Sequence, residues 1–174
     1  MNQEIDIIKK WLEEVIIGLN ICPFAREPYL KNQINFVFSE VKDIEETVEA
    51  ELKNLANDEF QTSLIITQGS ILYYELVDLV DFLNGTLNTN NTYQFIVFHP
   101  EFHFGDTPMN SRANLVNRSP YPLIHILKNS ELDNLLNTEQ AKMLSFQNEK
   151  SLNRLTNKEL EKYFNYLNIE QFKL

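Results

Sequence analysis

The sequence predicts a single α/β domain with a small, mainly parallel three-stranded sheet. Three short apolar segments, at residues 34–40, 62–67 and 93–98, have the length and composition of buried strands. Two amphipathic segments of helical length separate them, and this β-α-β-α-β alternation is typical of right-handed crossovers between parallel strands. The chain has 174 residues, of which 43% are hydrophobic, so we expect one domain over residues 1–174 with its own core.

Helices are expected between and around these strands. Residues 3–19 carry apolar side chains at helical spacing, and Pro23 excludes a longer helix because proline lacks an amide proton. The two crossover helices are expected from Asp43 to about Asn57 and over 71–84. Each of them would place its apolar face against the sheet.

The C-terminal half has a less regular pattern. Residues 101–122 show no clear periodicity and contain three prolines and a glycine, which predicts a long loop of a kind that is usually functional. A further helix is expected over 123–136. Thr156 and Glu159 have the spacing of a capping box, which predicts the start of a terminal helix.

Charge and composition exclude several classes of function. The net charge is −10 and no run of Lys or Arg breaks it, so binding to nucleic acid or to anionic membranes is disfavoured. The single cysteine excludes an intrachain disulfide. No apolar run reaches the roughly 18 residues of a membrane span, and the N-terminus lacks the basic and apolar regions of a signal peptide. We therefore expect a cytoplasmic protein.

Residue types suited to chemistry gather in two short stretches of the chain. All six prolines lie in 23–28 or in 100–122. The histidines, the cysteine and three of the four arginines lie in or beside the same stretches: Cys22, Arg26, His99, His103, Arg112, Arg118 and His125. The segment 99–125 is formally neutral in a strongly acidic chain, which favours an anion-binding site there.

The expected topology places one of these residues at a sheet edge. Ligands of open parallel sheets bind at the carboxyl ends of the strands. Ser39–Glu40, Gln68–Gly69 and His99–Pro100 would all lie at that edge. His99 directly follows an apolar strand, so a rigid element would hold its ring.

Three segments carry a resemblance to a known family. GLNICPFAR at 18–26, FHPEFHF at 98–104 and NRSPYPLIHIL at 117–127 resemble the signature stretches of the domain-of-unknown-function 1415 family in order and spacing. The resemblance covers nearly the whole chain and implies a small bacterial domain without an established activity. The positions that match the signature are Cys22, Pro23, Phe24, His99, Pro100, Asn117, Arg118, Ser119, Pro120, Tyr121, Pro122 and His125.

The favoured interpretation is an enzyme for a small anionic substrate. Cys22 would be a nucleophile or redox thiol, with His99 or His125 as its base. A guanidinium clamp would hold a carboxylate or phosphate, because its planar fork matches both groups. The candidate substrate-binding residues are Arg26, Asn117, Arg118, Ser119 and Tyr121. The competing interpretations are a buried structural Cys22 and an Arg118 that pairs with a buried acid.

Two other functions stay open. A zinc site could form from Cys22, His99 and His125, although the sequence has no CxxC or HExxH pattern and no cofactor is expected. A non-catalytic module could bind a small molecule or a protein in an aromatic groove. The side chains available for that groove are Phe24, Phe98, Phe102, Phe104 and Tyr121. The sequence leaves the substrate, the reaction and the oligomeric state undetermined.

Overall fold

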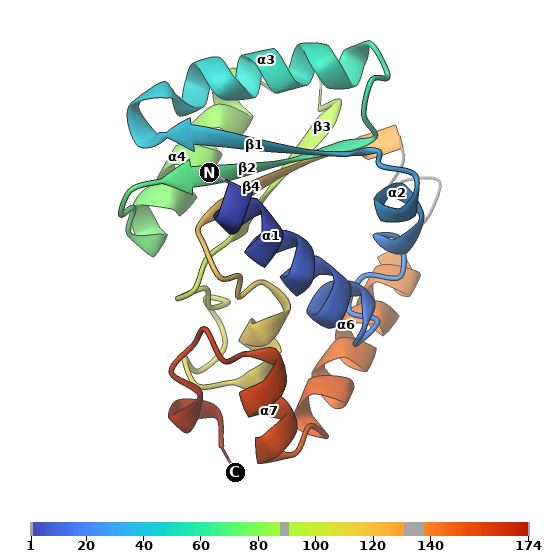
Figure 1. Ribbon diagram of the computed structural model, residues 1–174, viewed down its shortest axis with the longest axis vertical. Helices are drawn as coiled ribbons and strands as arrows, with labels where there is room; N and C mark the ends of the chain where they lie inside the picture. The colour runs from blue at the N-terminus through green and yellow to red at the C-terminus, as the bar shows by residue number, and fades with distance from the viewer. Residues whose placement is uncertain (1, 88–90, 131–137, 174) are drawn as a thin grey trace.

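A four-stranded mixed sheet organises the fold in the computed structural model, which describes residues 2–87, 91–130 and 138–173 (Figure 1). Its strands are β1 (Ile34–Glu40), β2 (Thr62–Gln68), β3 (Tyr93–Phe98) and β4 (Leu123–Lys128), in the order β1-β2-β4-β3. The three strands expected from the sequence are present with almost unchanged bounds. The expectation of a three-stranded, mainly parallel sheet is wrong, because a fourth strand lies inside the sheet.

The fourth strand separates the two strands that the second crossover connects. β1 pairs with β2 in parallel, and β4 pairs antiparallel with both β2 and β3. The crossover helices are α3 (Ile44–Ala56) and α4 (Tyr73–Thr86). β1, β2 and β3 therefore run in the same direction, but β2 and β3 are held together through β4.

The expected helix over 123–136 is wrong for its first part, which forms β4, and residues 131–136 lie outside the described residues. Leu123 packs into one core, whereas Ile124 and Ile126 pack into the other, on the opposite face of the sheet. A central strand is apolar on both faces, and a short run of this kind has the same composition as a buried helix.

Two layers of helices cover the sheet (Figure 1). α3 and α4 pack on one face, over a core that includes Ile65, Leu76 and Ile124. The other face is covered by α1 (Asn2–Trp11) and by η1 (Leu12–Ile17), a π-helix that continues it. The remaining helical elements are α2 (Arg26–Leu30), η2 (Val41–Asp43), η3 (Arg112–Val116), α6 (Thr138–Asn153), α7 (Asn157–Tyr163) and η4 (Ile169–Phe172).

The end of the N-terminal helix and the start of α7 lie close to where the local sequence predicts them. The N-terminal helix ends at Ile17, close to the expected position, and Gly18 follows it. A Cβ atom at Gly18 would lie 2.3 Å from the Glu14 carbonyl oxygen, so only glycine fits this close approach. The capping box is confirmed, because the Thr156 amide donates to the Glu159 carboxylate at 2.8 Å and α7 begins at the next residue.

The buried side chain of Arg112 holds the long segment between β3 and β4 in place. Arg112 Nε donates to the Phe172 carbonyl at 2.8 Å, and its Nη1 donates to the Leu155 carbonyl at 2.7 Å. Nη1 also lies within hydrogen-bond distance of the carbonyls at Leu152 and Asn153, at the end of α6. A cation at a helix C-terminus is favourable because the last carbonyls are unpaired and the helix dipole is negative there.

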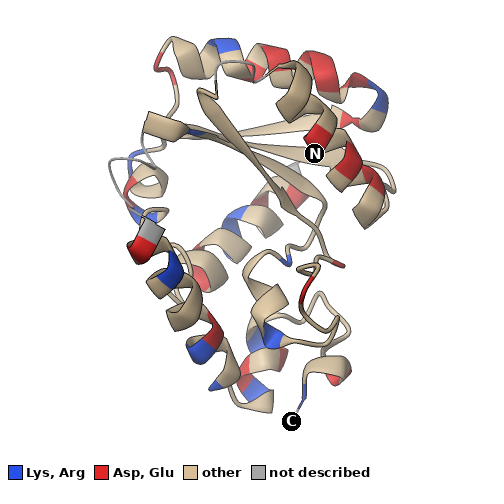
Figure 2. Ribbon diagram, turned by 180° about the vertical axis from the view of Figure 1, so that it is seen from behind, with Lys and Arg blue, Asp and Glu red and all other residues tan. Residues whose placement is uncertain are grey.

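Acidic side chains dominate the helix layer that α3 and α4 form. Figure 2 shows Asp and Glu along α3 and α4, in keeping with the net charge of −10. No helix among the described residues has the length and hydropathy that crossing a membrane requires.

We predict that Arg112→Lys destabilises the fold by about 2–3 kcal/mol, because a single ammonium cannot replace the fork that joins three chain segments. The matched control is Arg154→Lys, at an exposed arginine, which should change stability by less than about 0.5 kcal/mol. Urea unfolding followed by circular dichroism measures both. Equal stability of the two variants would show that the carbonyl contacts of Arg112 do not support the fold.

Candidate functional site

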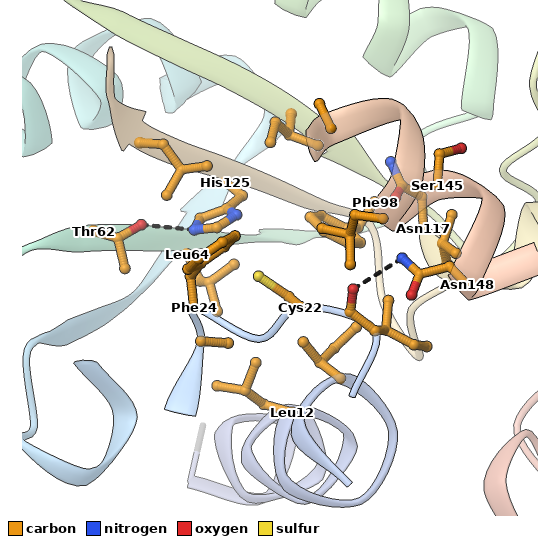
Figure 3. Close-up of a pocket in the computed structure, with 18 of the residues that line it drawn as sticks. Leu12, Cys22, Phe24, Thr62, Leu64, Phe98, Asn117, His125, Ser145 and Asn148 are labelled. Carbon is orange, nitrogen blue, oxygen red and sulfur yellow. Dashed lines mark hydrogen bonds between the residues drawn. The ribbon is translucent and has the colours of Figure 1, made fainter. Parts of the chain in front are cut away.

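A cavity of about 590 Å³ lies on the sheet face that the N-terminal helix covers (Figure 3). Its walls come from the sheet, from α1, η1 and α2, from the segment before β4, and from α6. Most of the lining is apolar: Trp11, Leu12, Ile16, Ile21, Phe24, Ala25, Pro28, Ile34, Leu64, Ile96, Phe98, Phe104, Ala113, Val116, Leu127, Ala141 and Leu144. The polar lining residues are Cys22, Gln61, Thr62, Asp106, Thr107, Asn117, His125, Ser145, Asn148 and Glu149.

The floor of the cavity is a row of side chains across three strands. Leu64 of β2 and Ile96 of β3 both pair with His125 of β4, so the histidine stands between two aliphatic neighbours. Directly opposed residues of antiparallel strands project from the same face, which explains why all three line the cavity. The imidazole is therefore fixed by the central strand of the sheet.

Thr62 fixes the orientation of that imidazole. Its hydroxyl oxygen lies 2.6 Å from His125 Nε2 and 2.6 Å from the Ile126 carbonyl oxygen. Thr62 is two residues from Leu64 along β2, so it reaches the histidine diagonally across the strand pair. Figure 3 shows this contact at the edge of the cavity.

Burial keeps His125 neutral. Desolvation lowers the pKa of the imidazole to about 4, because the charged form loses its hydration in an apolar environment. Phe98 adds to that environment, with its ring centroid 6.0 Å from that of His125. At neutral pH the cavity therefore presents an uncharged ring.

Cys22 lies in the turn that follows the N-terminal helix. Its amide donates to the Ile16 carbonyl at 3.2 Å, and the half-buried side chain points into the cavity (Figure 3). Burial raises the pKa of the Cys22 thiol, and hydrogen bonds from the Phe24 and Ala25 backbone offset this only in part. The protonated thiol is thus favoured, whereas a nucleophilic cysteine needs the thiolate.

α6 forms a wall that the sequence interpretation did not include. Ala141, Leu144, Ser145 and Asn148 line the cavity at helical spacing. The Asn148 side chain donates to the Ile21 carbonyl at 2.9 Å, which joins α6 to the turn that carries Cys22. The signal for this helix is weak, because most of its side chains are exposed and its apolar face is narrow.

His99 lies on the other side of the sheet from the cavity lining. It is 5% exposed, and its Nε2 donates to the Ile71 carbonyl at 3.0 Å. Nδ1 accepts a hydrogen bond from the Glu101 amide at 3.0 Å, so both ring nitrogens are used within the fold. Burial lowers the pKa of His99. This arrangement orders the turn after β3 and separates His99 from Cys22 and His125.

The predicted arginine clamp is not assembled at the cavity. Arg26 is exposed on α2. Arg118 is 3% exposed, and it donates to the carbonyls of Phe102 and Met109 at 2.8 and 3.1 Å. Its guanidinium lies 4.8 Å from the centre of the Phe172 ring. The partners of Arg118 are thus carbonyl groups and an aromatic face, where the sequence suggested an anion or a buried acid.

Of the other predicted binding residues, Asn117 lines the cavity and Ser119 does not. The Asn117 side chain donates to the Val97 carbonyl at 3.1 Å. Ser119 is buried and donates to the Tyr121 carbonyl, so this pair stabilises the Pro-rich turn before β4.

For the suggested zinc ligands, the described residues contain no group of three or more His, Cys, Asp or Glu side chains placed to hold a metal ion.

A second, polar cavity of about 480 Å³ adjoins the first and shares Phe24, Pro28 and Gln61 with it. Its two lysines already have partners. Lys31 pairs with Glu27 at 2.6 Å, and Lys128 pairs with Asp58. The second cavity therefore has balanced charges.

The cavity also differs in place from the expected site. It reaches Ile34 and Thr62, which begin β1 and β2, and it lies over the face of the sheet. The rule for strand carboxyl ends applies to sheets covered by crossover helices on both faces. Here the N-terminal and C-terminal helices cover the sheet face opposite α3 and α4, and the cavity is the space between these helices.

Comparison with known proteins gives one result. The model of the family described as "Protein of unknown function (DUF1415)" matches residues 3–162. No curated protein and no solved structure matches the chain.

We predict that His125 makes the protein less stable in acid. The unfolded chain takes up a proton near pH 6.5, whereas the folded state takes it up only near pH 4. Stability is therefore full above pH 6.5 and falls as the pH decreases toward 4, by roughly 3 kcal/mol from this residue. Between pH 7 and pH 4.5, the free energy of unfolding measured in urea should decrease less for His125→Gln than for the native chain. An identical loss in both would contradict the neutral, desolvated ring.

A second prediction concerns the thiol. Iodoacetamide reacts with thiolate, so at pH 7.5 we expect Cys22 in the folded protein to react about tenfold more slowly than in the urea-unfolded chain. Mass spectrometry of timed samples measures both rates on the same single cysteine. Faster reaction in the folded protein would mean that the cavity stabilises the thiolate, and it would restore the nucleophile interpretation.

Proposed function

The chain belongs to the DUF1415 family, whose description names no activity, and we propose from the geometry of the cavity that it binds a small, largely apolar molecule. The observation that carries the proposal is the cavity of about 590 Å³ with its mostly apolar lining. Cavities of roughly 300–1,000 Å³, lined by apolar and aromatic side chains with a few polar groups, are typical of small-molecule sites.

The charges around the cavity support a neutral ligand. Its described lining includes Asp106 and Glu149 and contains no Lys or Arg. An anion would lose its hydration there without gaining a cationic partner. This favours an uncharged molecule over the carboxylate or phosphate that the sequence suggested.

The protonation states support binding over nucleophilic catalysis. Burial raises the pKa of Cys22 and lowers that of His125, so both groups are uncharged at neutral pH. An activated cysteine needs the opposite shifts, toward a thiolate and an imidazolium.

A second candidate function is an enzyme that acts on the same molecule. The observation in its favour is that Cys22 and His125 line one cavity (Figure 3). A bound ligand would then lie beside both groups.

The test uses N-phenyl-1-naphthylamine, a neutral molecule that fluoresces when it enters an apolar site. We predict saturable binding of one molecule per chain. Ala141→Phe, which adds a ring to the cavity wall, should weaken binding at least about tenfold. Gln147→Phe adds the same ring on a part of α6 that does not line the cavity, and it should leave binding unchanged.

A charged counterpart completes the test. 8-Anilino-1-naphthalenesulfonate has nearly the same rings and carries a sulfonate, so the proposal predicts weaker binding for it. Tighter binding of the sulfonate would favour an anionic ligand. Unsaturable binding of both dyes, or equal effects of the two Phe variants, would rule out the cavity as the site.

A further inference from the structure

We propose that the ligand of the cavity carries a hydroxyl or N–H group that donates a hydrogen bond to Nδ1 of His125. This inference rests on the proposed function and adds the chemical class of the ligand, an apolar alcohol, phenol or amide-like N–H compound.

The first step is the position of the Thr62 proton. A threonine hydroxyl has one proton and can accept two hydrogen bonds. Its oxygen lies 2.6 Å from the Ile126 carbonyl oxygen, which can only accept, so the hydroxyl proton points to that carbonyl. The Thr62 oxygen is then an acceptor for its other neighbour, His125 Nε2, which also lies 2.6 Å away.

The second step is the tautomer of His125. The short contact with Thr62 requires a proton on Nε2, because two lone pairs would otherwise face each other. A neutral imidazole has one ring proton, so Nδ1 carries the lone pair. Burial, which lowers the pKa of His125, supports the neutral form.

The third step is the state of Nδ1. Within residues 2–87, 91–130 and 138–173, no group donates a hydrogen bond to this atom. The ring lines the cavity between Leu64 and Ile96, whose side chains cannot form hydrogen bonds. A ligand that fills the cavity would cover this acceptor, which is costly unless the ligand places a donor there, so Nδ1 selects a ligand with a donor at this position.

The lone pair also selects against anions. A carboxylate or phosphate presents only acceptor oxygens when it is ionised, and these would face the Nδ1 lone pair. A hydroxyl attached to an apolar body satisfies both features of the cavity, since the body contacts the aliphatic floor and Phe98 while the proton reaches Nδ1.

Matched ligands test the inference by calorimetry on the intact chain. 2-Naphthol and 2-methoxynaphthalene differ by the hydroxyl proton, and 2-naphthoate carries an anion. We expect 2-naphthol to bind about tenfold more tightly than 2-methoxynaphthalene and the naphthoate to bind most weakly. Equal affinity of the naphthol and its ether would overturn the inference and leave the proposed function intact. If neither the three naphthalene compounds nor N-phenyl-1-naphthylamine binds, both the inference and the proposed function are overturned.

Variants of Thr62 assign the preference to the tautomer. Thr62→Ser keeps the hydroxyl and should preserve the tenfold gap between naphthol and ether. Thr62→Val removes the acceptor for Nε2 while nearly keeping the volume, and it should reduce the gap to less than about threefold. A full gap in the valine variant would show that the hydroxyl recognition does not depend on His125 Nε2–H.

A ligand-free measurement checks the same assignment. Long-range proton–nitrogen correlation spectra distinguish protonated from unprotonated ring nitrogens of histidine. At pH 7 we expect the His125 signals to show a proton on Nε2 and none on Nδ1. A proton on Nδ1 would overturn the inference, whatever the ligands do.

Discussion

The buried guanidinium of Arg112 joins parts of the chain that are far apart in sequence, and the walls of the cavity depend on that junction. It donates to carbonyl groups at the end of α6 and to the Phe172 carbonyl near the C-terminus. The last carbonyls of a helix lack partners within it, and the end of a helix is where a cation is most favourable. Because η3 holds Arg112 directly before the segment that leads into β4, the same contact positions α6 opposite the sheet. Burial lowers the pKa of Arg112, and the fixed carbonyl dipoles compensate for the lost hydration.

The position of β4 in the sheet decides which face receives the histidine. β4 lies between β2 and β3, so its alternate residues enter two separate cores. His125 falls on the face with the cavity, whereas Ile124 and Ile126 fall on the face covered by α3 and α4. A shift of register by one residue would exchange these positions. The hydrogen bond between His125 and Thr62 and the pairing of Leu64 with His125 come from the same register.

The cavity combines an apolar lining with a small number of oriented polar groups. Cys22, His125 and Asn117 come from the two stretches in which the sequence concentrates its unusual residues, and they line one space. His99 and Arg118 come from the second stretch, but they serve the backbone of the long segment after β3. The residues of that segment therefore divide into two groups, one that faces the cavity and one that holds the segment in place. The arginines belong to the second group, which makes the cavity better suited to an uncharged ligand.

The sequence by itself determined the three strands that run in the same direction, their crossover helices, the end of the N-terminal helix near Gly18, the capping box at Thr156 and membership of the DUF1415 family. These features depend on local patterns or on short distinctive segments. The tertiary structure alone decided that residues 123–128 form a central strand, that α6 closes the cavity, and that Arg112 and Arg118 bind carbonyl groups. A short apolar run is compatible with a helix or a strand until its neighbours are known. The partner of a buried cation depends on which backbone groups the fold leaves unpaired, and no local pattern contains that information.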